Sequence, residues 1–506
     1  MGDEGQHAVT SPPSAGRPGP AGPVGDIAPD EFRARAHQVA DWIADYLTMV
    51  DRYPVAARVR PGEIAARLPA APPEEPEPLA EILADVDRLI LPGITHWNHP
   101  GFLGYFAITG SAPGILGEML AAALNVNAML WRTAPAASEL EEVVCDWLRQ
   151  LLGLPAGFLG MINETASVST LCALAAAREA LTDLRIRERG LAGRADVPRL
   201  RLYASEEAHA SVEKAAIVLG IGQEGLRKIP TDAEFRLDPA ALAAAIAEDR
   251  ARGWRPFAVV ATVGTTSTTS VDPVPAVAEI CAREGLWLHV DAAYAGSAAI
   301  VPELSWALAG CDRADSLVVN PHKWLFTPLD CSVLFTRRPE ALRAAFSLVP
   351  PYLLSPESGG RDLMDYGVSL GRRFRALKLW FVLRAFGRVG IIARLREHIR
   401  LARSFADWLD AAEDFERLAP VPFSTVNFRY HPSAVGPSDD PAVEAALDRL
   451  NERLEQAVNA SGRAFISHTR VRGRYALHVA IGNLRTTAEH VARLQDLLRE
   501  LAPGLT

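Results

Sequence analysis

Two short apolar segments, each followed closely by a charged side chain, constrain the fold of this 506-residue chain most strongly. Residues 286–290 lead into Asp291, and residues 317–319 are followed by Pro321 and then Lys323. Apolar runs of this length, rich in β-branched residues and closed by proline, are typical of buried strands. Because ligands of open α/β sheets bind at the carboxyl ends of the strands, we expect Asp291 and Lys323 to face one binding site.

Lysine is scarce in the chain, which carries only Lys214, Lys228, Lys323 and Lys378. A GC-rich genome would explain the preference for arginine elsewhere, but only lysine can lose its proton and form a Schiff base. A Schiff-base lysine, together with a carboxylate that pairs with a pyridinium nitrogen, is the arrangement that pyridoxal phosphate requires. The sequence therefore predicts pyridoxal 5'-phosphate as the cofactor.

Two specific motifs surround these residues, Asn-Pro-His-Lys-Trp at 320–324 and His-Val-Asp-Ala-Ala-Tyr-Ala-Gly at 289–296. With them the chain resembles the aromatic-L-amino-acid decarboxylase family, the group II pyridoxal-phosphate-dependent decarboxylases, from about residue 30 to the C-terminus. The resemblance implies an α/β fold of the fold-type I PLP-dependent transferase class. Such a fold has a mostly parallel sheet between helices, an N-terminal helical segment and a small α+β C-terminal domain. Alternation of strand patterns, at 200–205 and 257–263, with helix patterns such as 274–284 favours the same sheet. Residues 331–335 predict an antiparallel strand after Lys323, and residues 425–430 predict a strand of the C-terminal domain.

The resemblance also assigns roles at the cofactor site. Lys323 would hold the cofactor, Asp291 would pair with its ring nitrogen, and His209 would stack on the ring and hold it against Ala293. The other predicted cofactor contacts are Ala166, Ser167, Thr266, Asn320 and His322. Taken alone, a histidine or serine at the start of a helix is more often a structural cap than a ligand contact.

The phosphate contacts have a physical reason in residues 161–178, where a polar turn opens an alanine-rich helix. A helix N-terminus offers unpaired backbone N–H groups and the positive end of the helix dipole, which suits a phosphate monoester. Glu164 stands in this turn where relatives usually carry glycine. Since a carboxylate repels phosphate, we expect Glu164 to point away, with helix capping as one option.

Residues 348–360 form a Pro/Ser/Gly segment without periodicity, which is typical of a mobile loop. The segment contains Tyr352 at the position of the family's catalytic tyrosine, the expected proton donor to Cα. The predicted catalytic residues are therefore Lys323, Tyr352, His209 and Asp291. By resemblance, the substrate-binding residues would be Trp97, Tyr105, Phe106, Met129 and Gly371. Packing in the aromatic core is the competing interpretation of the first three.

The predicted function is decarboxylation of an aromatic L-amino acid, of the tryptophan, phenylalanine, tyrosine or DOPA type, to the arylalkylamine and carbon dioxide. The alternatives are an aromatic aldehyde synthase, a decarboxylase of a non-aromatic amino acid, an aminotransferase of the same fold, and a non-enzymatic scaffold. Lys323 and Asp291 together disfavour a scaffold. Among plant relatives the position of Gly371 tends to be glycine in tryptophan decarboxylases and serine in tyrosine decarboxylases, which favours indole.

The rest of the chain limits its partners and compartment. A net charge of −9 without a basic block argues against nucleic acid. No apolar run is long enough to span a bilayer and no signal sequence is evident, so we expect a cytoplasmic protein. The five cysteines lack metal-ligand spacing and predict neither a metal site nor disulfides. By resemblance the protein would be a homodimer with active sites at the subunit interface.

Four regions follow from composition, pattern and resemblance. Residues 1–26, rich in proline and glycine, are predicted to be a disordered tail. Residues 27–110 form the predicted N-terminal helical dimerisation segment. Residues 111–380 form the large cofactor-binding domain, and residues 381–506 form the small C-terminal domain.

Overall fold

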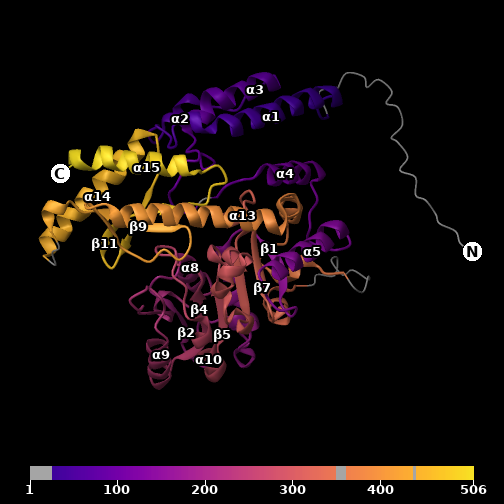
Figure 1. Ribbon diagram of the computed structural model, residues 1–506. Helices are drawn as coiled ribbons and strands as arrows, with labels where there is room; N and C mark the ends of the chain where they lie inside the picture. Colours follow the sequence, from indigo (N-terminus) through magenta and orange to yellow (C-terminus); the bar gives the residue numbers. More distant parts are fainter. Residues whose placement is uncertain (1–24, 107, 349–359, 437–439, 506) are drawn as a thin grey trace, which may run out of the picture. The chain divides into compact units, whose positions relative to one another are not determined.

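The computed structural model describes residues 25–106, 108–348, 360–436 and 440–505 (Figure 1). The chain divides into two compact units. The first comprises residues up to Tyr53 together with Ala57–Thr95, and the second comprises Pro54–Ala56 together with His96–Thr506. The predicted tail and the segment around Tyr352 lie almost wholly outside the described residues. Within the described ranges, no helix combines the length and apolar character needed to cross a membrane.

The first unit is helical. Its α-helices are α1 (Pro29–Met49), α2 (Glu63–Arg67) and α3 (Leu79–Asp85). α3 continues into a wider turn at Val86–Ile90, where the carboxylate of Asp87 accepts a hydrogen bond of 2.7 Å from the Trp42 indole N–H of α1. Trp42 also stacks on Tyr46 one turn later. These contacts join two helices that bury little apolar surface of their own, since no residue of α1 or α3 is buried.

The second unit contains a seven-stranded sheet. Its strands are β1 (Leu159–Asn163), β2 (Leu200–Ser205), β3 (Leu226–Ile229), β4 (Arg255–Thr262), β5 (Trp287–Asp291), β6 (Ser316–Val319) and β7 (Ser332–Thr336). The strand order is β1-β7-β6-β5-β4-β2-β3. The pairs from β6 to β3 are parallel, and β7 runs antiparallel to both of its neighbours. Six strands therefore point the same way and bring their carboxyl ends to one edge.

Helices cover both faces of this sheet. The helices before the small domain are α4 (Ala112–Leu124), α5 (Pro135–Leu151), α6 (Ala166–Glu179), α7 (Ile186–Arg189), α8 (Ala210–Val218), α9 (Pro239–Ala251), α10 (Val274–Glu284), α11 (Pro321–Trp324) and α12 (Pro339–Phe346). α6, α8 and α12 share one apolar cluster, whereas α5, α9 and α10 belong to the cluster on the opposite face. A parallel sheet needs both layers because its strands are apolar on both sides.

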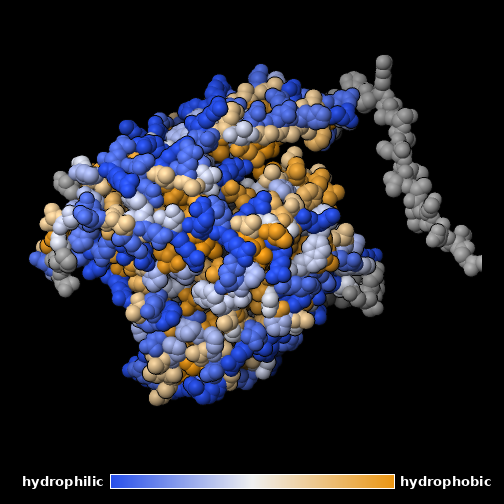
Figure 2. All heavy atoms as spheres, viewed as in Figure 1, coloured by the Kyte–Doolittle hydropathy of each residue, from blue (hydrophilic) through white to orange (hydrophobic). Residues whose placement is uncertain are grey.

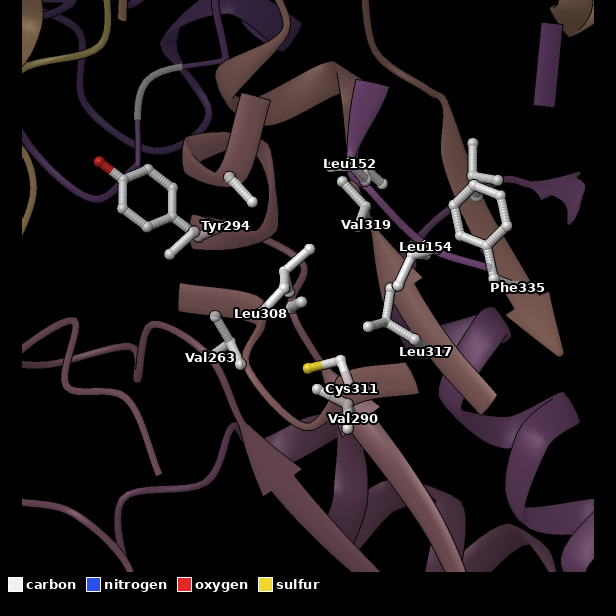
Figure 3. Close-up of a cluster of buried hydrophobic side chains, with 14 of the residues drawn as sticks. Leu152, Leu154, Val263, Val290, Tyr294, Leu308, Cys311, Leu317, Val319 and Phe335 are labelled. Carbon is white, nitrogen blue, oxygen red and sulfur yellow. The ribbon is translucent and has the colours of Figure 1, made fainter. Parts of the chain in front are cut away.

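The core against α5 and α10 holds the strands that lead to the predicted site. Figure 3 shows Val290 of β5 and Leu317 and Val319 of β6 in one apolar cluster with Leu154 and Phe335. These five side chains are at most 4% exposed. Close packing at this density makes the strand ends rigid supports for the polar residues that follow them.

The C-terminal part of the second unit, which the sequence predicts as a small domain, contains a four-stranded antiparallel sheet of order β10-β11-β9-β8. Its elements are α13 (Arg375–Ala411), β8 (Phe415–Arg417), β9 (Thr425–Tyr430), α14 (Pro441–Ser461), β10 (Ser467–Val471), β11 (Arg474–Ala480) and α15 (Ala488–Leu501). α13 packs on α4 and α5 at one end and on β8 and β9 at the other (Figure 1). Gly387, with a φ of 59°, interrupts its helical geometry.

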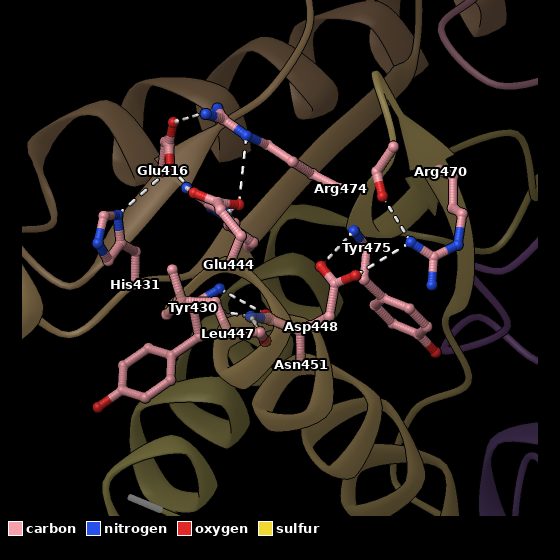
Figure 4. Close-up of polar contacts among 12 residues, drawn as sticks. Glu416, Tyr430, His431, Glu444, Leu447, Asp448, Asn451, Arg470, Arg474 and Tyr475 are labelled. Carbon is pink, nitrogen blue, oxygen red and sulfur yellow. Dashed lines mark hydrogen bonds and ion pairs between the residues drawn. The ribbon is translucent and has the colours of Figure 1, made fainter. Parts of the chain in front are cut away.

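Polar contacts fix the outer surface of the small sheet (Figure 4). Glu416 and Glu444 both pair with Arg474, at 3.7 and 3.4 Å. Asn451 of α14 exchanges two hydrogen bonds with the backbone of Tyr430, which ties the helix to the end of β9.

Several predicted elements are confirmed. The predicted strands at 200–205 and 425–430 are β2 and β9, the predicted helix at 274–284 is α10, and β7 is antiparallel as predicted. All five cysteines are free and buried.

One buried histidine links the helix that carries Lys323 to α13. The Trp324 indole N–H donates to His398 Nδ1 at 3.0 Å, and His398 Nε2 lies 3.1 Å from the carbonyl of Asn483. This arrangement fits one neutral tautomer, with the proton on Nε2. Burial lowers the pKa of His398 from 6.5 to about 4.

The histidine makes stability depend on pH in a defined direction. Because the unfolded state binds this proton below pH 6.5 and the folded state only near pH 4, stability should be lost as pH falls between these values, by up to about 3 kcal/mol. The midpoint of thermal unfolding should therefore fall less steeply with pH in His398→Gln than in the wild type. His37→Gln, at an exposed position of α1, is the control and should keep the wild-type slope.

Candidate active site

A cavity of about 160 Å³ opens at the carboxyl ends of the parallel strands. All nine predicted cofactor-binding residues line it: Ala166, Ser167, His209, Thr266, Asp291, Ala293, Asn320, His322 and Lys323. They come from the starts of α6 and α8, from the loops after β4 and β5, and from the segment after β6. The structure thus brings together residues more than 150 positions apart in the sequence.

Lys323 and Asp291 form the charged centre of the cavity. Burial lowers the pKa of Lys323, and the charge of Asp291 counteracts this effect in part. Asp291 also accepts a hydrogen bond of 3.1 Å from the backbone N–H of Ala293, which orients its carboxylate at the strand end. A lysine whose pKa is depressed by burial is more readily available as the neutral amine that attacks a carbonyl group.

His209 combines the two roles that its sequence position allows. It is the N-cap of α8, where the backbone N–H of Ser211 donates to its Nδ1 at 3.2 Å. The ring also lines the cavity, and burial lowers the pKa of His209 while Asp291 opposes that shift. Nδ1 is therefore an acceptor and Nε2 carries the proton, so the cap fixes the ring that faces the cavity.

The start of α6 has the features expected of a phosphate site. Thr165, its N-cap residue, makes no side-chain hydrogen bond to the helix, which leaves the first-turn N–H groups without that cap. Glu164 points away as expected, toward Arg375 at 3.4 Å and the hydroxyl of Ser369 at 3.3 Å. It is not the N-cap residue, so the capping option was wrong.

Two further polar groups in the cavity fit a bound polar ligand. Asn320 Oδ1 and Thr262 Oγ1 are buried and have no hydrogen-bond partner within the described part of the chain. A buried polar atom without a partner is costly, and a ligand with donors and acceptors would relieve that cost. The donors at α6, these two atoms, the Asp291 carboxylate and the Lys323 amine suit a phosphorylated pyridine aldehyde.

His322 lies beside Lys323 as a neutral donor. Its Nδ1 accepts the backbone N–H of Cys331 at 2.9 Å, so the proton must be on Nε2. Burial lowers the pKa of His322 to about 3, and the neighbouring charge of Lys323 acts in the same direction. The ring can therefore donate one hydrogen bond into the cavity but adds no positive charge.

An aromatic wall closes the cavity beside the lysine. The ring of Phe106 stacks on Tyr294 at 4.0 Å, and Tyr294 stacks on Trp324 at 4.9 Å. Lys323 Nζ lies 5.0 Å from the centre of the Phe106 ring. Of the predicted substrate-binding residues, Phe106 is the one found among the residues that line this cavity.

The other predicted substrate residues lie elsewhere. Trp97 and Tyr105 stack on each other at 5.9 Å and are 36% and 55% exposed. Met129 and Gly371 flank Asn127, whose amide N–H lies 3.1 Å from the Met129 sulfur and 4.0 Å from the position of a Cβ on Gly371. Tyr352 is outside the described residues.

Sequence reasoning missed four residues that line the cavity, Thr165, Thr262, Gly264 and Tyr294. Tyr294 stood inside a recognised motif, three residues after Asp291, but was given no role. Thr262 is the last residue of β4, and Gly264 lies between it and Thr266, so their sequence positions next to Thr266 already indicated the same sheet edge.

The fold and the cavity define an enzyme that binds a pyridoxal-type cofactor at the carboxyl edge of a mostly parallel sheet. Residues 61–431 match the pyridoxal-dependent decarboxylase conserved domain. The chain therefore belongs to the pyridoxal-dependent decarboxylase family, and pyridoxal phosphate is its cofactor.

Three relatives show the breadth of this similarity. The chain is 41% identical to tyrosine decarboxylase 4 of Petroselinum crispum, over 96% of this chain and 95% of that protein. It is 38% identical to phenylacetaldehyde synthase of a Rosa hybrid cultivar, over 95% of each chain. The crystal structure of Oryza sativa TDC with PLP and tryptamine superposes with a TM-score of 0.90 at 37% identity, covering 95% of this chain and 99% of that one.

Replacing Lys323 with alanine should remove the covalent attachment of the cofactor and abolish turnover, since no other lysine lines the described part of the cavity. Borohydride reduction followed by peptide mass spectrometry would locate the attachment. Lys228→Ala, which removes an exposed lysine paired with Glu213, is the matched control. This variant should keep both the cofactor label that borohydride fixes to Lys323 and the activity. Label retained in the Lys323→Ala protein would refute the assignment.

Proposed function

We propose that the protein decarboxylates an aromatic L-amino acid and releases the arylalkylamine and carbon dioxide. The observation that carries this proposal is the aromatic wall that Phe106 and Tyr294 form next to the Lys323 amine, with Trp324 stacked behind Tyr294. An aromatic side chain packs favourably against such a wall, whereas a charged side chain would lose its hydration there. The names of the relatives, a tyrosine decarboxylase and a TDC solved with tryptamine, support the same substrate class.

We assign the residues as follows. When bound, pyridoxal phosphate draws in the electron pair left at Cα by the loss of carbon dioxide. Lys323 would hold the cofactor through its side-chain amine. Asp291 would keep the ring nitrogen protonated through its negative charge. His209, whose ring is held by the α8 cap, would pack on the face of the cofactor ring.

The phosphate group would be held at the start of α6. The N–H groups at Ala166 and Ser167 are the donors there. Ser167, Thr266 and His322 add side-chain donors on the cavity wall. Asn320 Oδ1, which has no partner in the described part of the chain, would accept a hydrogen bond from a hydroxyl or protonated group of the ligand.

An aldehyde synthase is the second candidate, because one such enzyme is 38% identical to this chain. In the aldehyde-forming reaction the carbanion is oxidised by oxygen instead of being protonated at Cα. The presence of both Tyr352 and His209 favours the amine, since we propose that the Tyr352 phenol delivers the proton. A phenol has an ordinary pKa of about 10, so phenols as a class can donate a proton at neutral pH.

The exchange of Tyr352 for phenylalanine tests this function. It keeps the ring and removes the hydroxyl, so carbon dioxide release should persist while amine formation falls by about 100-fold or more. In air, aldehyde, ammonia and hydrogen peroxide should appear instead. Amine, aldehyde and peroxide are measured from one aromatic substrate for both proteins. An unchanged amine yield without peroxide would remove Tyr352 from the mechanism, and aldehyde as the main product of the wild type would favour the synthase.

The preferred side chain is proposed to be indole. Among the described residues, a Cβ added at Gly371 would have no neighbour nearer than Asn127 Nδ2, at 4.0 Å. A serine there would fill part of that space and add a hydroxyl. In support of indole, we propose that the side chain of the substrate reaches this space from the cavity, so that glycine suits the larger ring.

Gly371→Ser should therefore lower the ratio of kcat/KM for tryptophan to that for tyrosine by about tenfold, the effect expected of a small change in pocket size. The two amino acids are compared in one carbon dioxide release assay. The unfolding midpoint serves as the folding control, because the added side chain meets open space. An unchanged ratio in a well-folded variant would show that this position does not select the substrate.

We propose a homodimer with active sites at the subunit interface, in which the stretch around Met129 and the first helices contact the partner. In its support, α4 exposes a row of leucines at four-residue spacing, Leu116, Leu120 and Leu124, each 49–58% exposed. Figure 2 shows hydrophobic side chains gathered over α4 on the viewed face. An apolar helix face of this kind is more typical of an interface than of a solvated surface. Light scattering at micromolar concentration measures the state directly.

We propose a cytoplasmic location. All five cysteines are free and buried, which suits a reducing compartment. Cell fractionation with activity measured in each fraction tests the location.

A further inference from the structure

Tyr105, the residue before the aromatic wall, has an unusual backbone conformation. Its φ is +53°, in the left-handed region that side-chain-bearing residues rarely adopt. Tyr105 lies in no helix or strand, so no backbone ladder holds it there. Such a conformation persists only where the surroundings fix it, and it often marks a functional site.

Two side chains of the small domain hold this residue on both sides. The backbone N–H of Tyr105 donates to Ser467 Oγ at 2.8 Å. Its carbonyl oxygen lies 3.1 Å from Nε2 of His478, a side chain that is 3% exposed. Ser467 starts β10 and His478 belongs to β11, and the two residues are cross-strand neighbours. One rigid antiparallel pair therefore grips the peptide groups on either side of Tyr105.

The same histidine is also linked to the loop after β4. His478 Nδ1 lies 3.0 Å from Asn427 Oδ1, and the Asn427 amide donates to the carbonyl of Ser267 at 2.8 Å. Ser267 follows Thr266, which lines the cavity. His478 is thus connected both to the loop after β4 and to the residue before Phe106.

We infer that His478 is a positioning residue that sets the affinity for the aromatic side chain of the substrate. Its Nε2–H donates to the Tyr105 carbonyl and holds the backbone of Tyr105 in the left-handed conformation. That conformation places the ring of Phe106 over Lys323. Phe106 stacks on Tyr294 at 4.0 Å and lies 5.0 Å from Lys323 Nζ, so a shift of the Tyr105 peptide would move a ring next to the reacting amine. The His478 ring also meets Phe106 edge-on at 6.2 Å.

The neutral His478 ring carries a single N–H, and this decides how the hydrogen bond to Tyr105 is assigned. Burial lowers the pKa of His478 to about 4, so at neutral pH the ring carries one N–H, although it faces the backbones of Tyr105 and Ser267 as well as Asn427 Oδ1. The oxygens on the Nδ1 side belong to residues that are bonded to each other, and Asn427 is fixed in the buried strand β9. Tyr105 lies in no helix or strand, so the single proton has its greatest effect there.

Two variants distinguish the role of Nε2 of His478 from the role of its Nδ1. In His478→Gln the side-chain amide can reach the place of Nε2 and keep a donor for Tyr105. In His478→Asn the amide occupies the place of Nδ1, faces Asn427 and is too short to reach Tyr105. The inference rests on the proposed aromatic substrate, so a readout that does not depend on turnover is needed beside the kinetics.

The holoenzymes are compared by steady-state kinetics with tryptophan and tyrosine, by unfolding midpoint and by crystal structure. We expect His478→Asn to raise KM by about tenfold with a smaller change in kcat, and to lose the left-handed φ of Tyr105, while His478→Gln stays within about threefold of wild type and keeps it. Equal effects of the two variants on KM and on Tyr105, or no effect of either, would overturn the inference. If no aromatic amino acid is a substrate, the φ of Tyr105 in the two structures still decides it.

Discussion

The parallel pairing of β5 with β6 is the constraint on which the cavity depends. Asp291 lies opposite Val318, so β6 ends one residue beyond the level of that carboxylate. Asn320, His322 and Lys323 follow immediately and are delivered to the same sheet edge. A slip of one residue would turn Asp291 to the other face of the sheet. The buried valines and leucines of these strands, packed in one cluster, hold the register against such a slip.

Local sequence patterns were sufficient for the scaffold and for the polar contents of the cavity. β2, β9 and α10 have the predicted bounds, because each is a strongly patterned segment closed by clear turn or capping residues. The nine cofactor-site predictions share one cavity because motifs at strand ends and helix starts converge at the edge of a parallel sheet. In these cases the local signal and the packing point to the same answer.

Local sequence patterns could not predict which aromatic residues line the cavity. Trp97, Tyr105 and Phe106 lie within ten residues, yet Phe106 lines the cavity while the other two stack outside its lining. The left-handed Tyr105 separates them, and that conformation is set by Ser467 and His478, more than 350 residues away. A local sequence pattern cannot predict a contact with residues at the far end of the chain. Tyr294 was overlooked for a related reason, since its role arises from stacking between distant segments.

Burial makes the cavity poor in positive charge. It lowers the pKa values of His209, His322 and Lys323, and among the described residues that line the cavity Lys323 is the single lysine or arginine. A phosphate group held there cannot depend on a cluster of cations as exposed phosphate sites do. In the roles proposed above it would depend on the start of α6, on neutral donors such as Ser167, Thr266 and His322, and on the low dielectric that strengthens these dipoles. Asp291 would then act on the ring nitrogen, and Lys323 would compete little for its carboxylate, because burial lowers the pKa of that lysine.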